Sequence, residues 1–216
     1  MTTTGPDSNI LDAEAINWRL IVYPIVAVVV LLLGGIGYYF YQLDQQNMHE
    51  AQAHNAALQA KTPEDLVKVA DQFPNTIQGT LARLNAANGF FVKKNYDAAG
   101  KEYQQIINQP GTDAGLHDAA QLGLGSIFEA NNKVDDAINA YLSVARRGKE
   151  SPYAPFAYHS IAGIYEQRGD KMNERLTLMQ AASLDADSQF VKEAQAKLKA
   201  LDAASASTPA PAPAKP

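Results

Sequence analysis

The chain contains no cysteine and has no excess of basic residues. Without cysteine it can form no disulfide, no thiolate zinc site and no cysteine nucleophile, although this does not decide the cellular compartment. With a formal net charge of -5, it also lacks the surplus of lysine and arginine by which proteins neutralise nucleic-acid phosphates. We therefore expect no nucleic acid among its partners.

Charge is missing altogether from one long stretch. Residues 20–40 read LIVYPIVAVVVLLLGGIGYYF, and no charged residue occurs between Arg19 and Asp44. About 20 apolar residues at roughly 1.5 Å each span the ~30 Å hydrocarbon core of a bilayer, where backbone groups must pair within a helix. We predict a transmembrane anchor helix over residues 18–41, preceded by a polar segment over residues 1–17.

The flanks of this run bear on processing and orientation. The run is too long for the apolar part of a signal peptide, and no small-residue cleavage site follows it closely, so an uncleaved anchor is expected. Arg19 is the only basic residue on the N-terminal side, and none follows the run until Lys61. Because basic residues are retained on the cytoplasmic side, we expect a cytoplasmic N-terminus and an exported C-terminal domain.

After the anchor, one pattern of small and aromatic residues occurs three times, each copy divided by a short polar turn (KKN, NNK and RGD). Two antiparallel helices approach closely only where small residues lie at the crossing, and aromatic rings fill the space beside it. Each copy therefore reads as a helical hairpin, and hairpins must stack because one alone cannot bury its apolar face. The repeated positions are Ala87, Phe90, Tyr96, Ala99 and Tyr103, then Gly125, Phe128, Val134, Ala137 and Tyr141 38 residues later, then Ala162 and Tyr165 after a further 37.

This spacing resembles the tetratricopeptide repeat, over residues 80–186 as three repeats. The fold class is accordingly all-α: a transmembrane helix followed by a tetratricopeptide-like α-solenoid of about three to four hairpins. We assign residues 42–79 to a juxtamembrane helix and a degenerate first helix pair, and residues 187–202 to a capping helix. Residues 203–216, rich in alanine and proline, are expected to be a disordered or polyproline-like tail.

The third copy departs from the pattern in its second helix. Glu174 stands where a small residue is expected, and Lys171 stands where an apolar one is expected. We predict that this helix packs more loosely than its counterparts, as terminal repeats often do.

Evidence for catalysis is weak. His49, Glu50 and His54 resemble the H-E-x-x-H zinc motif, but the segment HEAQAH is one residue too long. At about 100° per residue, positions five apart diverge by roughly 140° and do not share a helix face. A metal hydrolase is therefore only a remote alternative. Ser126, in GLGSIF, lacks the preceding strand of a nucleophile elbow. No catalytic residue, cofactor site or metal site is predicted.

A family resemblance rests on three features: the anchor, the segment MHEAQAHNAAL and the segment ADQFPNTIQGTLARLNAANGFFVKKNYDAAGKEYQQII. Over residues 18–145, the chain resembles the YfgM-like family. Members of that family are ancillary subunits of the Sec translocon in the bacterial inner membrane, with a periplasmic tetratricopeptide domain. The resemblance implies a single-pass protein with a cytoplasmic N-terminus, whose partners are translocon subunits, a periplasmic chaperone or exported polypeptide. An adaptor for cell-envelope assembly or division is the alternative, favoured by the proline-rich tail.

Tetratricopeptide geometry implies a concave groove lined by the first helix of each repeat. Related receptors for chaperone tails place a lysine- and arginine-rich carboxylate clamp there, and here only Asn88 matches it. We therefore expect an apolar to acidic groove that takes a helix or an extended polypeptide. The candidate partner-binding residues are Leu84, Asn88, Phe91, Leu122, Ser126, Glu129, His159 and Glu166. The same predicted lining also includes Val92, Ala130, Phe156, Gly163 and Gln167.

Overall fold

The computed structural model describes residues 18–184 and 187–207, and within this part every regular element is a helix. The predicted all-α fold class is confirmed. The chain divides into two units, residues 1–48 and 49–216. The polar segment predicted over residues 1–17 and most of the predicted tail, residues 208–216, lie outside the described residues.

The first unit contains the greater part of helix α1 (Trp18–Gln59). Pro24 lies inside this helix, in its second turn, where its missing N–H removes one hydrogen bond near the helix start. Between Val22 and Gln59 the helix is long and apolar enough to cross a membrane, and Leu31, Leu32 and Leu33 are each at least 60% exposed. A membrane anchor has this length and composition, and so does a signal sequence near an N-terminus.

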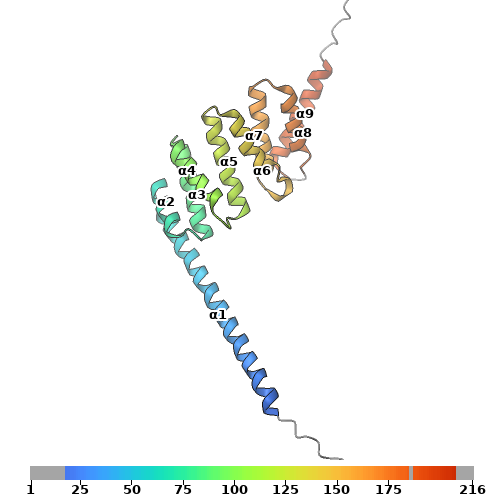
Figure 1. The fold of residues 1–216 in the computed structure, drawn as a ribbon. Helices are drawn as coiled ribbons and strands as arrows, with labels where there is room; N and C mark the ends of the chain where they lie inside the picture. Colours follow the sequence, from blue (N-terminus) through green and yellow to red (C-terminus); the bar gives the residue numbers. More distant parts are fainter. Residues whose placement is uncertain (1–17, 185–186, 208–216) are drawn as a thin grey trace, which may run out of the picture. The chain divides into compact units, whose positions relative to one another are not determined.

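The second unit starts with the last turns of α1 and continues as a stack of helix pairs (Figure 1). Within each pair the two helices pack along each other, and each pair also packs on the next, so that α5 contacts both α3 and α4. Helix α9 packs on α7 and α8 in the same manner. The helices are α2 (Pro63–Gln72), α3 (Ile77–Val92), α4 (Tyr96–Asn108), α5 (Ala114–Ala130), α6 (Val134–Ala145), the 3-10 turn η1 (Gly148–Glu150), α7 (Ala154–Gln167), α8 (Lys171–Ala182) and α9 (Gln189–Ser207).

The three polar turns adopt one conformation at equivalent positions. Lys94, Asn132 and Gly169 have φ of 60°, 56° and 70°, the left-handed region that ends many helices. In each turn the next amide donates to a carbonyl five residues earlier, as from Asn95 to Phe90 at 2.9 Å. These bonds satisfy carbonyls that the helix end leaves unpaired. The tight hairpin turns predicted from KKN, NNK and RGD are confirmed.

The small residues lie where the helices cross. Ala87, Ala99 and Ala137 are fully buried, Ala162 is 2% exposed, and Gly125 is buried as well. A Cβ on Gly125 would lie 2.5 Å from the ring of Tyr141, far inside van der Waals contact, so glycine is the residue that lets this ring pack flat on α5.

The predicted loose packing of α8 is wrong. Glu174 is only 3% exposed, and its carboxylate accepts a hydrogen bond from Lys171 Nζ at 2.9 Å. The two unexpected residues compensate each other because positions three apart are neighbours on one helix face. Leu178 and Ala181 of α8 are buried beside them, and α8 packs on α7 as closely as α4 packs on α3.

Helix α9 runs to Ser207, so it takes up the first five residues of the predicted tail, which was placed from residue 203. The reason is composition: Ala203, Ala204 and Ala206 are the strongest helix formers, and the first proline comes only at Pro209. The other predicted domain limits stay predictions.

Candidate functional site

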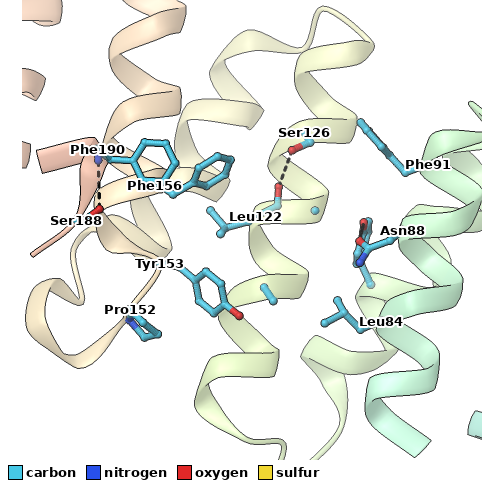
Figure 2. Close-up of a pocket in the computed structure, with 13 residues that line it drawn as sticks. Leu84, Asn88, Phe91, Leu122, Ser126, Pro152, Tyr153, Phe156, Ser188 and Phe190 are labelled. Atoms are coloured by element: carbon cyan, nitrogen blue, oxygen red, sulfur yellow. Dashed lines mark hydrogen bonds between the residues drawn. The ribbon is translucent and has the colours of Figure 1, made fainter. Parts of the chain in front are cut away.

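A cavity of about 630 Å³ lies between the first helices of the repeats. Helices α3 and α5 form one part of its wall, and the start of α7 and the start of α9 form the other (Figure 2). A volume of ~300–1,000 Å³ is usual for ligand sites in proteins. Its lining residues are Leu84, Asn88, Phe91, Tyr103, Ala119, Leu122, Gly123, Ser126, Pro152, Tyr153, Phe156, Ser188 and Phe190.

The repeat places like positions of successive helices beside each other in this wall. Leu84 and Asn88 of α3 and Leu122 and Ser126 of α5 occupy equivalent positions, 38 residues apart. Side chains four apart on a helix share one face, so both helices present an apolar residue and a small polar residue to the cavity. The wall is therefore a direct product of the repeated sequence.

Tyr103, which belongs to α4, also contributes its side chain to the cavity lining. Its ring lies against Gly123 of the next repeat, where a Cβ would be only 2.2 Å from the ring. Its hydroxyl donates to Asn88 Oδ1 at 2.6 Å. Burial raises the pKa of Tyr103 to about 12, so at neutral pH this hydroxyl keeps its proton and remains a donor to Asn88.

Ser126 and Glu129 of α5 both lie within hydrogen-bond distance of Tyr141 of α6, in their own hairpin. Ser126 Oγ donates to the Leu122 carbonyl at 3.1 Å and lies 3.1 Å from the Tyr141 hydroxyl. That hydroxyl donates to Glu129 Oε2 at 3.0 Å, and burial is the first cause of its raised pKa. The carboxylate of Glu129 is thus directed to Tyr141 and does not line the cavity.

The cavity is neutral and aromatic. None of the thirteen described residues that line it is charged, and five of them are aromatic. The predicted apolar character is present, whereas the acidic contribution expected from Glu129 is not. A ligand with a charged group would lose hydration here without gaining a counter-charge.

Five of the eight candidate residues meet in this cavity: Leu84, Asn88, Phe91, Leu122 and Ser126. The other three do not. Besides Glu129, His159 Nδ1 lies 3.5 Å from Glu193 of α9, and its ring centroid lies 5.1 Å from that of Phe190.

Glu166 also faces α9. It accepts a hydrogen bond from Lys197 Nζ at 2.6 Å, and this bond is the main reason that the pKa of the Glu166 carboxyl is lowered. With His159, it forms the seam between α7 and the last helix.

Seven residues of the lining were not predicted: Tyr103, Ala119, Gly123, Pro152, Tyr153, Ser188 and Phe190. Pro152 and Tyr153 come from the connector before α7, and Ser188 and Phe190 come from the start of α9. Conversely, the predicted residues Val92, Ala130, Gly163 and Gln167 do not line the cavity. Tyr153 is 37% exposed, and Phe156 packs edge-on against Phe190 at 5.4 Å. An aromatic residue in a connector, as in SPYAPF, was the one available signal.

The remaining clusters of polar residues are explained by the fold. Glu50 of α1 caps α3, because its carboxylate accepts from the amides of Ile77 at 2.7 Å and Gln78 at 3.0 Å. His54 Nδ1 lies 3.3 Å from the side-chain oxygen of Gln78. In the part of the chain that the structure describes, no three His, Cys, Asp or Glu side chains gather as a metal site would require.

Two arginines pair with carboxylates of other elements, and none of these residues lines the cavity. Arg83 of α3 donates to Glu102 of α4 at 2.6 Å and to Asp71 of α2 at 2.6 Å. Arg147 donates to the 2% exposed Asp118 at 2.6 Å. Because each pair joins different elements, both are read as parts of the stack.

Comparison with known proteins adds one match. A family model described as a tetratricopeptide repeat-like domain matches residues 15–148, a range that takes in the apolar helix and the first two helix pairs of the stack. No curated protein and no solved structure matches the chain.

Proposed function

Because the chain belongs to the tetratricopeptide repeat-like domain family, we propose that it is a non-catalytic scaffold that α1 tethers to a membrane and that holds a polypeptide partner in its groove. The observation that carries the proposal is the neutral, aromatic cavity of about 630 Å³, built from equivalent positions of neighbouring repeats. Aromatic anchors in such a pocket supply most of the binding energy of a protein interface.

A tether suits a groove of this size. The cavity accommodates only a short stretch of polypeptide, so a single contact of this kind has modest affinity. Anchoring at the membrane raises the local concentration of any partner held at the same membrane, which offsets modest affinity. The apolar part of α1 and the groove would thus act together.

At the finer level, we propose a YfgM-like role: an ancillary factor of the Sec translocon in the bacterial inner membrane, with the repeats in the periplasm. The matched range, residues 15–148, supports the role because it includes both the apolar helix and the first two repeats, in agreement with the resemblance over residues 18–145. Arg19, the one basic residue on the N-terminal flank, supports the orientation. The partners would be translocon subunits, a periplasmic chaperone or exported polypeptide.

An adaptor for envelope assembly or division is the second candidate. Its support is the proline-rich sequence TPAPAPAKP, which follows a helix of 19 residues, α9. An extended segment beyond such a helix would reach partners at a distance from the membrane. Deleting residues 208–216 separates the two candidates, because only the second requires that segment for partner capture.

The proposal is tested by photo-crosslinking from the groove. A photoreactive amino acid is placed at Phe91, which lines the cavity, and in a matched control at Val92, which is 80% exposed and not among the lining residues. We expect crosslinks to polypeptide from position 91 and few from position 92. Equal yields at both positions would remove the groove from the proposal, and products without a translocon subunit would remove the finer role.

Orientation is tested separately with a reporter enzyme that is active on one side of the membrane only, fused after residue 216. We expect activity on the exported side. A cytoplasmic result would contradict the translocon and envelope roles alike, whereas it would leave the groove intact as a binding site.

A further inference from the structure

We propose that the groove takes a proline-rich, extended segment, and that its occupant is the uncharged segment of residues 208–214 (TPAPAPA) of a second copy of this chain. The inference rests on the proposed function, since it names the ligand of the same groove.

The shape and chemistry of the lining suit proline. Phe156, Phe190 and Tyr153 stand on one side of the cavity and Phe91 stands on the other (Figure 2). Aromatic-lined grooves bind polyproline II segments because pyrrolidine rings pack on aromatic faces and the segment is already extended before it binds. An acidic or basic ligand would find no partner in this neutral lining.

The hydrogen-bonding groups point to the same ligand. Asn88 Oδ1 is occupied by the Tyr103 hydroxyl, which leaves the Asn88 amide N–H groups as donors toward the cavity. The Tyr153 hydroxyl is a second donor at the rim. Within the described residues, neither the Asn88 amide nitrogen nor the Tyr153 hydroxyl donates a hydrogen bond. Proline has a carbonyl but no N–H, so a proline-rich backbone offers acceptors to these donors.

A helical ligand would use them poorly. Its backbone carbonyls are already paired within the helix, so it would cover the donors of Asn88 and Tyr153 without offering them acceptors, which is unfavourable. The sequence TPAPAPAKP has prolines at 209, 211, 213 and 216, and the ring of proline restricts φ to values near that of polyproline II.

The segment cannot fill the groove of its own chain. Phe190, at the start of α9, lines the cavity, and Ser207 ends the same helix, about 26 Å further along at 1.5 Å per residue. Pro213 follows Ser207 by six residues and reaches at most about 22 Å at ~3.6 Å per residue, even fully extended. The prolines at 209–213 therefore occupy the groove of another copy, and head-to-tail contacts of this kind form a ring or an open chain of copies.

Peptide binding tests the chemistry. A fluorescent peptide with the sequence TPAPAPAKP is titrated with the full-length protein in detergent micelles, and anisotropy is followed. We expect saturable binding, an affinity about tenfold or more lower for Phe156→Ala, and unchanged affinity for Val92→Ala, whose side chain is outside the lining. A peptide with alanine at the proline positions should lose binding to the unaltered protein, which makes the result independent of how any variant folds.

Disulfide crosslinking tests which segment occupies the groove. Because the chain has no cysteine of its own, only introduced cysteines can form the disulfide. One preparation carries Ala119→Cys in the cavity wall, the other carries Ala212→Cys, and the two are mixed under oxidising conditions. We expect a disulfide between copies. Ser143→Cys, on the exposed face of α6, replaces Ala119→Cys as the control and should give none.

The outcomes separate this inference from the proposed function. If the peptide fails to bind while position 91 still crosslinks to other polypeptide, the inference is wrong and the proposed function stands. If peptide binding ignores Phe156→Ala, or the disulfide forms equally with Ser143→Cys, the inference is also wrong. If neither the peptide nor any other polypeptide reaches the groove, both are overturned.

Discussion

The packing of Tyr141 on Gly125 allows a paired test of the hairpin crossing. In Gly125→Ala the new Cβ would lie 2.5 Å from the Tyr141 ring, whereas at Gly163, inside α7, a Cβ would meet nothing within 4 Å. Both changes place alanine in a helix interior, which favours the folded state by about 1 kcal/mol. Only Gly125→Ala adds the overpacking term of about 1–3 kcal/mol, because the ring, 1% exposed, has no free space into which to move.

The free energy of unfolding should therefore rise by about 1 kcal/mol in Gly163→Ala. In Gly125→Ala it should be about 1–3 kcal/mol lower than in Gly163→Ala. Since about 1 kcal/mol shifts the melting temperature of a domain of this size by roughly 2–4 °C, the gap is measurable. The assay is thermal unfolding of the two full-length variants in detergent micelles, followed by circular dichroism at 222 nm. If Gly125→Ala proved as stable as Gly163→Ala, the argument that a small residue is needed at the crossing would fail.

Four further changes probe other features. Lys94→Gly should raise the free energy of unfolding by about 1 kcal/mol, as measured by urea unfolding. Residue 94 has φ of 60°, a conformation that is unfavourable for a residue with a side chain. Arg83→Ala should cost about 3–5 kcal/mol in urea unfolding, since it leaves the buried Glu102 carboxylate without its counter-charge; replacing both by apolar residues should recover most of the loss. Glu50→Ala should cost about 1 kcal/mol in the same assay by removing the carboxylate that caps α3, and an unchanged midpoint would contradict that role. Because burial raises the pKa of Tyr103 to about 12, its stabilising contribution is complete below pH ~10 and is lost as the pH rises toward 12; stability should therefore fall less steeply over this range in Tyr103→Phe, as measured by urea unfolding at each pH.

The repeated fold was predictable because its determinants are local. The spacing of Ala87, Phe90 and Tyr103 and its return 38 residues later encode both the helix face that is buried and the turn between helices. Even Lys94 and Asn132, which are unusual at φ > 0, occur at the same step as Gly169. Periodicity of this kind needs no knowledge of distant contacts.

Contacts between distant residues were not predictable. Arg83 meets Asp71 and Glu102, 12 and 19 residues away, and no local pattern pairs them. Glu174 and Lys171 each violated the repeat pattern, and the prediction of loose packing failed because the two were weighed singly, although together they form a hydrogen-bonded ion pair.

The candidate site divides in the same way. Leu84, Asn88, Leu122 and Ser126 follow from the repeat, so they could be predicted. His159 and Glu166 obey the repeat too, but α9 adds Glu193 and Lys197 opposite them, and the register of α9 on α7 is not encoded by the period.

The neutral lining of the cavity has a practical consequence for finding partners. Mobile ions screen the attraction between opposite charges, with a range that falls from ~10 Å at 0.1 M to ~3 Å at 1 M, and they do not weaken apolar contact. Since no charged side chain is among the described residues of the lining, a partner seated there should stay bound in a high-salt wash that removes proteins attached to the acidic exterior. A high-salt wash can thus distinguish proteins bound in the groove from proteins that are attached elsewhere by charge.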